Sequence, residues 1–219
     1  MGILPSCLAT GDGTFRTGVY SFGVDYSFSF AAPDLTGNGT ADVVFSVANG
    51  ISVCLGNGDG TFQPAVSYTV NDSNFGFVVV GDFNGDHILD VATPGLLGVW
   101  LFTGRGDGTF NPGVLAAALP SSTNQIAAAD FNGDGNLDLV VSSYSAGFVV
   151  LLGNGNGTFG SPQIFSQPKS PLGLAAGGLT KGGPAGIAIG SKSSGYVSHR
   201  QRRRRFFRTQ IRQPSRRGG

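Results

Sequence analysis

The chain has 219 residues and a formal net charge of +1, with 37 glycines and only 12% charged residues. No apolar run approaches the roughly 18–20 residues of a membrane helix, and no basic segment followed by an apolar stretch opens the chain, so neither a transmembrane helix nor a signal peptide is predicted. All 13 acidic residues are aspartates, and no nucleophile has a candidate base beside it in the pattern, so we expect a protein that is not an enzyme.

The net charge conceals an asymmetry along the chain. Nine of the 14 basic residues lie between Arg200 and Arg217, so residues 1–199 carry five basic and 13 acidic groups, a net charge of −8. Clustered carboxylates repel one another unless a cation neutralises them. The body of the chain is therefore predicted to bind metal.

Two motifs recur at nearly the same spacing. An aspartate-rich nonapeptide begins at residues 34, 82 and 130, with 48 residues between successive copies. The second motif, GDGTF or GNGTF, occupies residues 11–15, 58–62, 106–110 and 155–159. A repeat of about 20–50 residues buries its apolar face only against neighbouring copies, so this period indicates a solenoid, a propeller or another repeat array.

Short apolar runs lie between these motifs and are predicted to be β-strands. Gly98–Phe102 is one of them, and the third repeat holds four: Ile126–Phe131, Leu137–Ser142, Phe148–Leu152 and Pro162–Phe165. Four short antiparallel strands in a unit of 48 residues are typical of a propeller blade. The sequence predicts an all-β fold, a partial β-propeller of about four four-stranded antiparallel blades.

Residues 1–198 are expected to form the propeller, with incomplete blades at both ends because the first GDGTF has no aspartate loop before it. The expected blades are roughly 1–24, 25–72, 73–120, 121–169 and 170–198. Gly178–Ile187 stands where a fourth loop belongs, but it has no acidic residue and contains Lys181. We expect this last blade to hold no metal.

Each nonapeptide carries oxygen-bearing side chains at positions 1, 3, 5 and 9, with a main-chain carbonyl expected to contribute at position 7. Calcium takes about six to eight such oxygens. The candidate ligands are Asp34, Thr36, Asn38, Thr40 and Asp42 in the first loop, Asp82, Asn84, Asp86, Ile88 and Asp90 in the second, and Asp130, Asn132, Asp134, Asn136 and Asp138 in the third. The sequence predicts up to three Ca²⁺ ions, held most tightly by the third loop and least tightly by the first, following the number of carboxylates.

Three other structures could in principle use such loops: an EF-hand, a soft-metal site and plain Asx turns. An EF-hand is excluded because position 12, where that loop needs glutamate, is Phe45, Thr93 or Val141. A soft-metal site is excluded because no cluster of cysteine and histidine exists in the sequence. Plain Asx turns between strands are the alternative, since aspartate and asparagine favour them without any ion. His87 replaces the turn glycine of the second loop, where a positive φ is expected.

These residues carry a resemblance to a known family. DFNGDGNLDLVV at 130–141, followed by VVLLGNGNGTF at 149–159, resembles the FG-GAP/VCBS repeat, which is related to the blades of integrin α-chain heads and of some fungal lectins. The resemblance covers about residues 7–190. It implies an extracellular or cell-surface, calcium-bearing β-propeller, usually of about seven blades, that serves adhesion or binds a protein or glycan.

About four blades do not close such a ring, so the chain is expected to be a fragment that pairs with missing blades, a smaller ring, or half of a dimer with a second copy. Two rival functions remain open. The chain is alternatively the propeller portion of a polysaccharide-active enzyme, which a polar cleft of converging side chains would support. Trp100 is a candidate sugar platform, but its equivalents Val53 and Val150 are apolar, which favours core packing.

The segment 199–219 breaks every earlier pattern, with an arginine block around Phe206 and Phe207. It is predicted to be a disordered basic tail, or a shifted reading frame, because residues 193–198 still match 145–150. The second rival function, polyanion binding, would use this segment, although nucleic acid is not the favoured partner. A GNGDGTF-like string in another frame of the gene would establish the shift, and its absence from every frame would exclude it.

Overall fold

The computed structural model describes residues 3–6, 19–22, 29–119, 123–143, 147–166, 171–178, 185–191, 195–201 and 205–211. Every regular element in these ranges is a β-strand, and all paired strands are antiparallel. The prediction of an all-β fold is confirmed. In the same ranges no helix has the length and apolar character needed to span a membrane.

Five sheets follow one another along the chain. The first has two strands, β1 (Ile3–Ser6) and β2 (Val19–Phe22). Four four-stranded sheets follow, here named the first to fourth blades. The first blade consists of β3 (Phe30–Ala31), β4 (Val43–Val47), β5 (Gly50–Cys54) and β6 (Val66–Thr69), and the second of β7 (Val79–Gly81), β8 (Asp90–Pro94), β9 (Gly98–Phe102) and β10 (Val114–Ala118). The third blade consists of β11 (Thr123–Ala129), β12 (Asp138–Ser143), β13 (Gly147–Leu151) and β14 (Gln163–Phe165), and the fourth of β15 (Pro171–Gly177), β16 (Gly186–Ser191), β17 (Gly195–Gln201) and β18 (Arg205–Ile211). Within each blade the strands pair in chain order, as predicted for a propeller.

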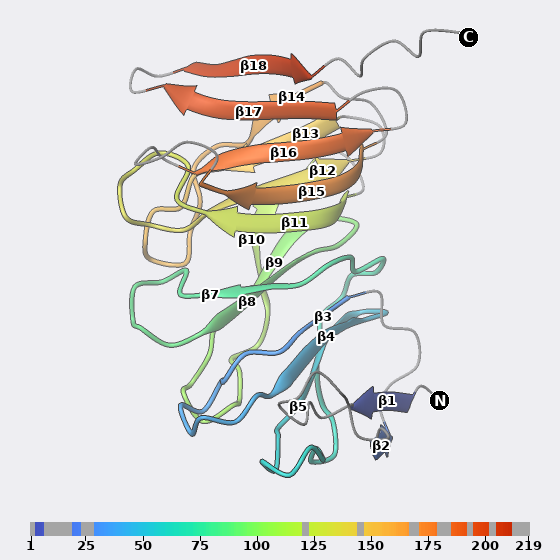
Figure 1. Cartoon of the computed structure of the whole chain (residues 1–219). Helices are drawn as coiled ribbons and strands as arrows, with labels where there is room; N and C mark the ends of the chain where they lie inside the picture. The colour runs from blue at the N-terminus through green and yellow to red at the C-terminus, as the bar shows by residue number, and fades with distance from the viewer. Residues whose placement is uncertain are drawn as a thin grey trace, which may run out of the picture.

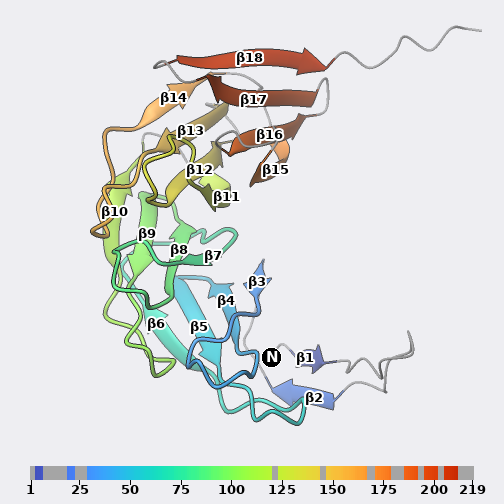
Figure 2. The same ribbon diagram turned by 60° about the vertical axis from the view of Figure 1, so that its left-hand side comes forward.

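The blades are arranged along an arc (Figures 1 and 2). In Figure 2 the first strand of each blade, β3, β7, β11 or β15, lies on the concave inner side, and β6, β10 and β14 lie on the outer side. Strand β11 contacts β7 and β8 of the blade before it and β15 of the blade after it. The inner strands therefore hold neighbouring blades together.

Three hydrophobic clusters fill the interfaces between consecutive four-stranded blades. Leu35, Val44 and Phe102 belong to the first of these clusters; Phe83, Leu101 and Leu139 to the second; and Phe131, Val140 and Ile187 to the third. Every residue of β5 and of β13 is buried, because both faces of these strands are covered. This explains why β13 is continuously apolar, while β5 carries one polar residue, Ser52, whose hydroxyl is hydrogen-bonded to Ser67.

Residues 199–201 and 205–211, within the segment 199–219, differ from the expectation of a disordered tail, and residues 195–198 lie within the part expected to form the propeller. Together these residues form β17 and β18, which pair from Gly195 with Ile211 to Gln201 with Arg205 and complete the fourth blade. Backbone hydrogen bonding is available to any sequence, so an arginine-rich composition does not exclude strands here. Residues 212–219 lie outside the described part of the chain.

Candidate metal sites

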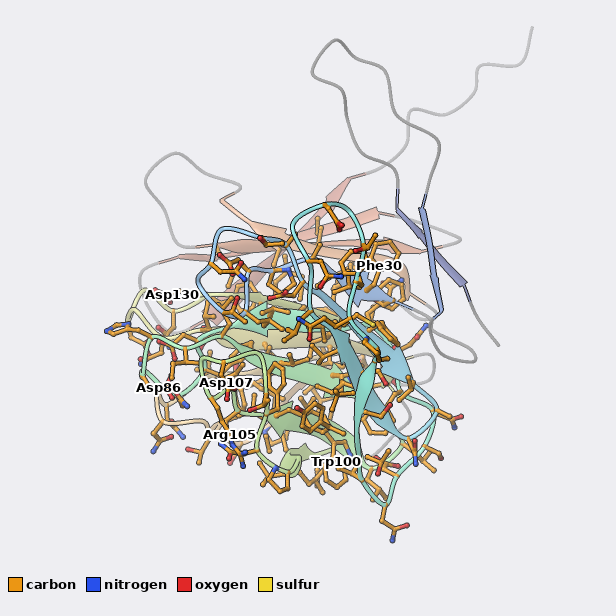
Figure 3. All side chains as sticks on the ribbon, turned by 90° about the horizontal axis from the view of Figure 1, so that it is seen from below. Phe30, Asp86, Trp100, Arg105, Asp107 and Asp130 are labelled. Atoms are coloured by element: carbon orange, nitrogen blue, oxygen red, sulfur yellow. The ribbon has the colours of Figure 1, made fainter. Side chains whose placement is uncertain are left out.

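The three nonapeptides occupy the same place in consecutive blades. They connect the inner strand to the second strand, between β3 and β4, between β7 and β8, and between β11 and β12. Figure 3 shows that Asp86 and Asp130, from two different loops, lie on one side of the molecule together with Asp107 of a GDGTF turn. This side of the arc therefore collects carboxylates from several repeats.

The aspartate at position 1 accepts backbone N–H groups from its own loop. Asp130 Oδ1 accepts from Gly133 at 2.6 Å and from Asn132 at 3.1 Å, and Asp130 Oδ2 accepts from Gly135 at 3.0 Å. Asp82 does the same with the N–H groups of its loop, and burial, which raises its pKa, is outweighed by these bonds, so the pKa of Asp82 lies below its usual value. In the first loop the N–H of Gly39, 2.7 Å from Asp34 Oδ2, is the main cause of a lowered pKa at Asp34.

The aspartate at position 9 is fully buried in all three loops, at Asp42, Asp90 and Asp138. Its Oδ2 accepts the N–H of position 2 at 2.8–3.0 Å, from Leu35, Phe83 and Phe131. Burial raises the pKa of Asp90 and of Asp138, and the other carboxylates of the same loop raise it further. In these two loops the ionised form is therefore costly in the absence of a cation.

The other oxygen of the position-9 carboxylate binds a glycine that the sequence analysis did not single out. Oδ1 accepts an N–H at 2.8–2.9 Å from Gly56, Gly104 or Gly153, which stands two residues before the first glycine of the GDGTF or GNGTF motif. A Cβ on Gly153 would lie 2.2 Å from the Leu137 carbonyl oxygen, and the other two glycines are equally close to backbone. Because these glycines recur with the period of the repeat, the sequence could have indicated that they have a structural role.

Positions 3, 5 and 7 are joined by hydrogen bonds between neighbours. In the third loop Asn132 Oδ1 accepts the N–H of Asp134 at 2.7 Å, and Asp134 Oδ1 accepts the N–H of Asn136 at 2.9 Å. Asn84, Asp86 and Ile88 repeat the pattern in the second loop. In the first loop, Thr36 Oγ1 donates to Asp34 at 3.5 Å and Asn38 Oδ1 accepts the N–H of Thr40 at 2.7 Å. These are successive Asx turns, the alternative weighed from the sequence.

The fit of a metal to these loops has two sides. Within the described residues, no three carboxylate, imidazole or thiol side chains are grouped closely enough to hold a metal ion. The donors are nevertheless oxygen atoms throughout, which suits a hard cation such as Ca²⁺. A carboxylate oxygen that accepts one N–H keeps lone-pair capacity for a second partner. The chemistry of the donors fits calcium, while the spacing of the carboxylates is that of hydrogen-bonded turns.

Within the described residues, the GDGTF and GNGTF motifs form tight turns. Asp59 Oδ1 accepts both the hydroxyl of Thr61 at 2.6 Å and its N–H at 2.9 Å, and Asp107 holds Thr109 in the same way. The threonine hydroxyl is the main cause of a lowered pKa at both aspartates. The motif therefore stabilises a turn through its own side chains.

Trp100 is tied to the neighbouring blade. Its Nε1 donates to Asp72 Oδ2 at 2.7 Å, and the same oxygen accepts the N–H of Leu97 at 3.1 Å. The indole is partly buried against the cluster between the first and second blades. These contacts support the expected role of Trp100 in core packing.

The φ of His87 is 65°, a left-handed conformation that costs a residue with a Cβ about 1–2 kcal/mol. Gly135 takes the equivalent place in the third loop with a φ of 90°. We expect His87→Gly to raise the free energy of unfolding by about 0.5–1 kcal/mol, after the entropy cost of glycine in the unfolded chain. Urea denaturation measures this change in the free energy of unfolding. Gly135→Ala, whose Cβ would meet no atom within 4 Å, is the control and should change stability in the opposite direction; a loss of stability in His87→Gly would contradict the strain argument.

Comparisons with known proteins agree with this architecture. The family model of the FG-GAP-like repeat matches residues 34–93, 97–141 and 130–181. A solved lectin of Agrocybe aegerita, described as recognising non-reducing terminal N-acetylglucosamine, is similar with 26% identity and a TM-score of 0.62, over 82% of this chain and 50% of the lectin chain. The Tc holotoxin pore of Photorhabdus luminescens matches with 18% identity and a TM-score of 0.47, over 97% of this chain and 11% of its own.

This chain thus spans half the length of the lectin. No protein with a curated description matches it significantly.

Proposed function

The chain belongs to the FG-GAP-like repeat family, and we propose that it is a calcium-binding, non-enzymatic repeat module that presents the surface of a partial β-propeller to a protein or glycan ligand. The observation that carries the calcium proposal is the fully buried position-9 carboxylate of the three loops. Where burial raises its pKa, at Asp90 and Asp138, a divalent cation would offset the cost of the ionised form.

The ligands for calcium would be the side chains at positions 1, 3, 5 and 9 and the main-chain carbonyl at position 7, which belongs to Thr40, Ile88 or Asn136. The third and second loops each offer three carboxylates, whereas the first offers Asp34 and Asp42 alone. We expect the first loop to bind most weakly and the third most tightly, because His87 strains the turn of the second loop. An extracellular setting, where calcium modules work with dissociation constants of about 0.1–1 mM, is part of this proposal.

Calcium should raise the melting temperature. At a concentration 100 times the dissociation constant, one site adds about 2.7 kcal/mol to the free energy of unfolding, and each kcal/mol raises the melting temperature of a chain of this size by about 2–4 °C. Differential scanning calorimetry with Ca²⁺ and with a chelator checks this. The controls are Mg²⁺ at the same concentration and the triple variant Asp34→Asn, Asp82→Asn and Asp130→Asn. Identical melting curves with calcium and with chelator would contradict the calcium proposal.

Glycan is the ligand class that the lectin similarity favours. Binding to immobilised glycans with and without terminal N-acetylglucosamine tests it directly. Retention by any glycan that a competing free sugar releases would support a lectin-like module. If no glycan is retained while calcium stabilises the protein, the ligand is to be sought among proteins.

A further inference from the structure

The aspartate loop of one blade is covered by the glycine-rich turn of the next blade. The rings of Phe83, at position 2 of the second loop, and Phe159, at the end of the GNGTF turn of the third blade, lie 6.3 Å apart at an interplanar angle of 56°. The N–H of Gly157 in the same turn donates to the carbonyl oxygen of Phe83 at 2.9 Å. Side chain and backbone of this turn therefore both dock on the loop.

The preceding pair of blades shows the same arrangement. Leu35, at position 2 of the first loop, is buried in one cluster with Phe110, at the end of the GDGTF turn of the second blade. A Cβ on Gly108 of that turn would lie 3.2 Å from Thr36 Cγ2. A turn therefore packs on the loop before it at two interfaces, and a backbone hydrogen bond joins turn and loop at the second of them.

The docked residue is the one that the buried carboxylate holds. Asp90 Oδ2 accepts the N–H of Phe83 at 3.0 Å, while the carbonyl of Phe83 accepts the N–H of Gly157. A single loop residue therefore carries one hydrogen bond to the position-9 aspartate and another to the next blade. Anything that orders Asp90 also orders the surface on which the turn of the third blade rests.

We propose that the first and second aspartate loops are latches between consecutive blades, in which the ordering of the loop and the docking of the following turn stabilise each other. The part that concerns calcium rests on the proposed function: a cation that orders the loop strengthens the contact between blades, and the docked turn raises the affinity of the loop for the cation, because coupling between two sites is reciprocal. The part that concerns docking stands on the packing and hydrogen bonds alone.

The chain contains a matched control for the latch. Phe62 ends the GDGTF turn of the first blade and is partly buried, as Phe159 is. It packs near Phe45 and Cys54, and the sequence before residue 34 holds no aspartate nonapeptide for it to cover. Removing the Phe62 ring therefore costs similar packing without touching a loop–turn contact.

The test is a calcium titration of the whole chain, followed by hydrogen–deuterium exchange of the peptides that span residues 82–90 and 130–138. For Phe159→Ala, we expect the calcium concentration that half-protects the 82–90 peptide to rise by about fivefold or more, while the 130–138 peptide keeps its midpoint. Phe62→Ala should shift neither peptide. Phe159→Leu, a milder change, should shift the 82–90 midpoint by less, and it keeps the test usable if the alanine variant does not fold.

An unchanged 82–90 midpoint in both Phe159 variants overturns the coupling, as does an equal shift in Phe62→Ala, which would report general loss of stability. If calcium protects no loop of the native protein, the proposed calcium-binding function is wrong, and the latch is then tested in the absence of metal. In chelator, Asp90→Asn should then speed exchange in the turn peptide 153–159 of the next blade and leave peptide 56–62 unchanged. Equal exchange in 153–159 for the native protein and Asp90→Asn would overturn the latch itself.

Discussion

Asp138→Ala is expected to lower the free energy of unfolding by about 2–6 kcal/mol in the absence of any metal. The fully buried carboxylate accepts the N–H of Phe131 and the N–H of Gly153, each at 2.8 Å. Alanine leaves both donors buried without a partner, and each such donor costs about 1–3 kcal/mol. Denaturation in urea with a chelator present measures the loss.

Asp134→Ala is the matched control in the same loop. Asp134 is exposed, and its carboxylate bonds only to other groups of the loop, Asn132 Nδ2 and the N–H of Asn136. Its loss should cost less than about 1 kcal/mol without metal, although the calcium proposal gives both residues a role once the ion is present. Equal destabilisation of the two variants in chelator would show that the buried position-9 carboxylate has no special structural role.

Gly76→Ala is expected to destabilise the chain by about 3 kcal/mol through the interface between the second and third blades. A Cβ on Gly76 would lie 2.0 Å from the backbone oxygen of Asn124, which belongs to β11 of the next blade. The same oxygen accepts the N–H of Phe77 at 2.9 Å. The added methyl group must therefore push the segment before β7 away from β11 and break this bond, and thermal or urea unfolding reports the result.

Gly173→Ala supplies the comparison for Gly76→Ala. A Cβ on Gly173 in β15 would meet no atom within 4 Å. We expect a change within about 0.5 kcal/mol at this position. If both alanine variants unfold at the same denaturant concentration, the close approach of Gly76 to Asn124 does not contribute to the stability of the interface.

The strands could be predicted well from local pattern, with errors in the residues at which they begin and end. Gly98–Phe102 is β9 as expected, and Phe148–Leu152 lies one residue from β13, Gly147–Leu151. Strand β11 begins at Thr123 and not at Ile126, because Thr123 pairs with Ser143 across an irregularity in the register. Partners on another strand decide where a strand begins, and a window of sequence does not contain them.

The candidate loops were predictable as turns but not in their connections to the rest of the molecule. The spacing of Asp82, Asn84 and Asp86 is enough to predict that these side chains bind their own loop, because Asx turns span only two to five residues. The bond from Asp90 to Gly104 joins residues 14 apart, and the contact of Phe83 with Phe159 joins different blades. No local rule contains either contact.

The sequence by itself determined the repeat, the four-stranded blade, the tight GDGTF turns and the oxygen-rich loops, because each of these depends on the period of the motifs or on turn chemistry within a few residues. Tertiary structure alone decided three further features. It buried the position-9 carboxylates against a glycine of the following turn, it placed the turns of the second and third blades on the loop of the preceding blade, and it carried the strand pairing through Arg205–Ile211. The physical reason is that desolvation and packing depend on which blades are neighbours, and this is set only when the whole arc has formed.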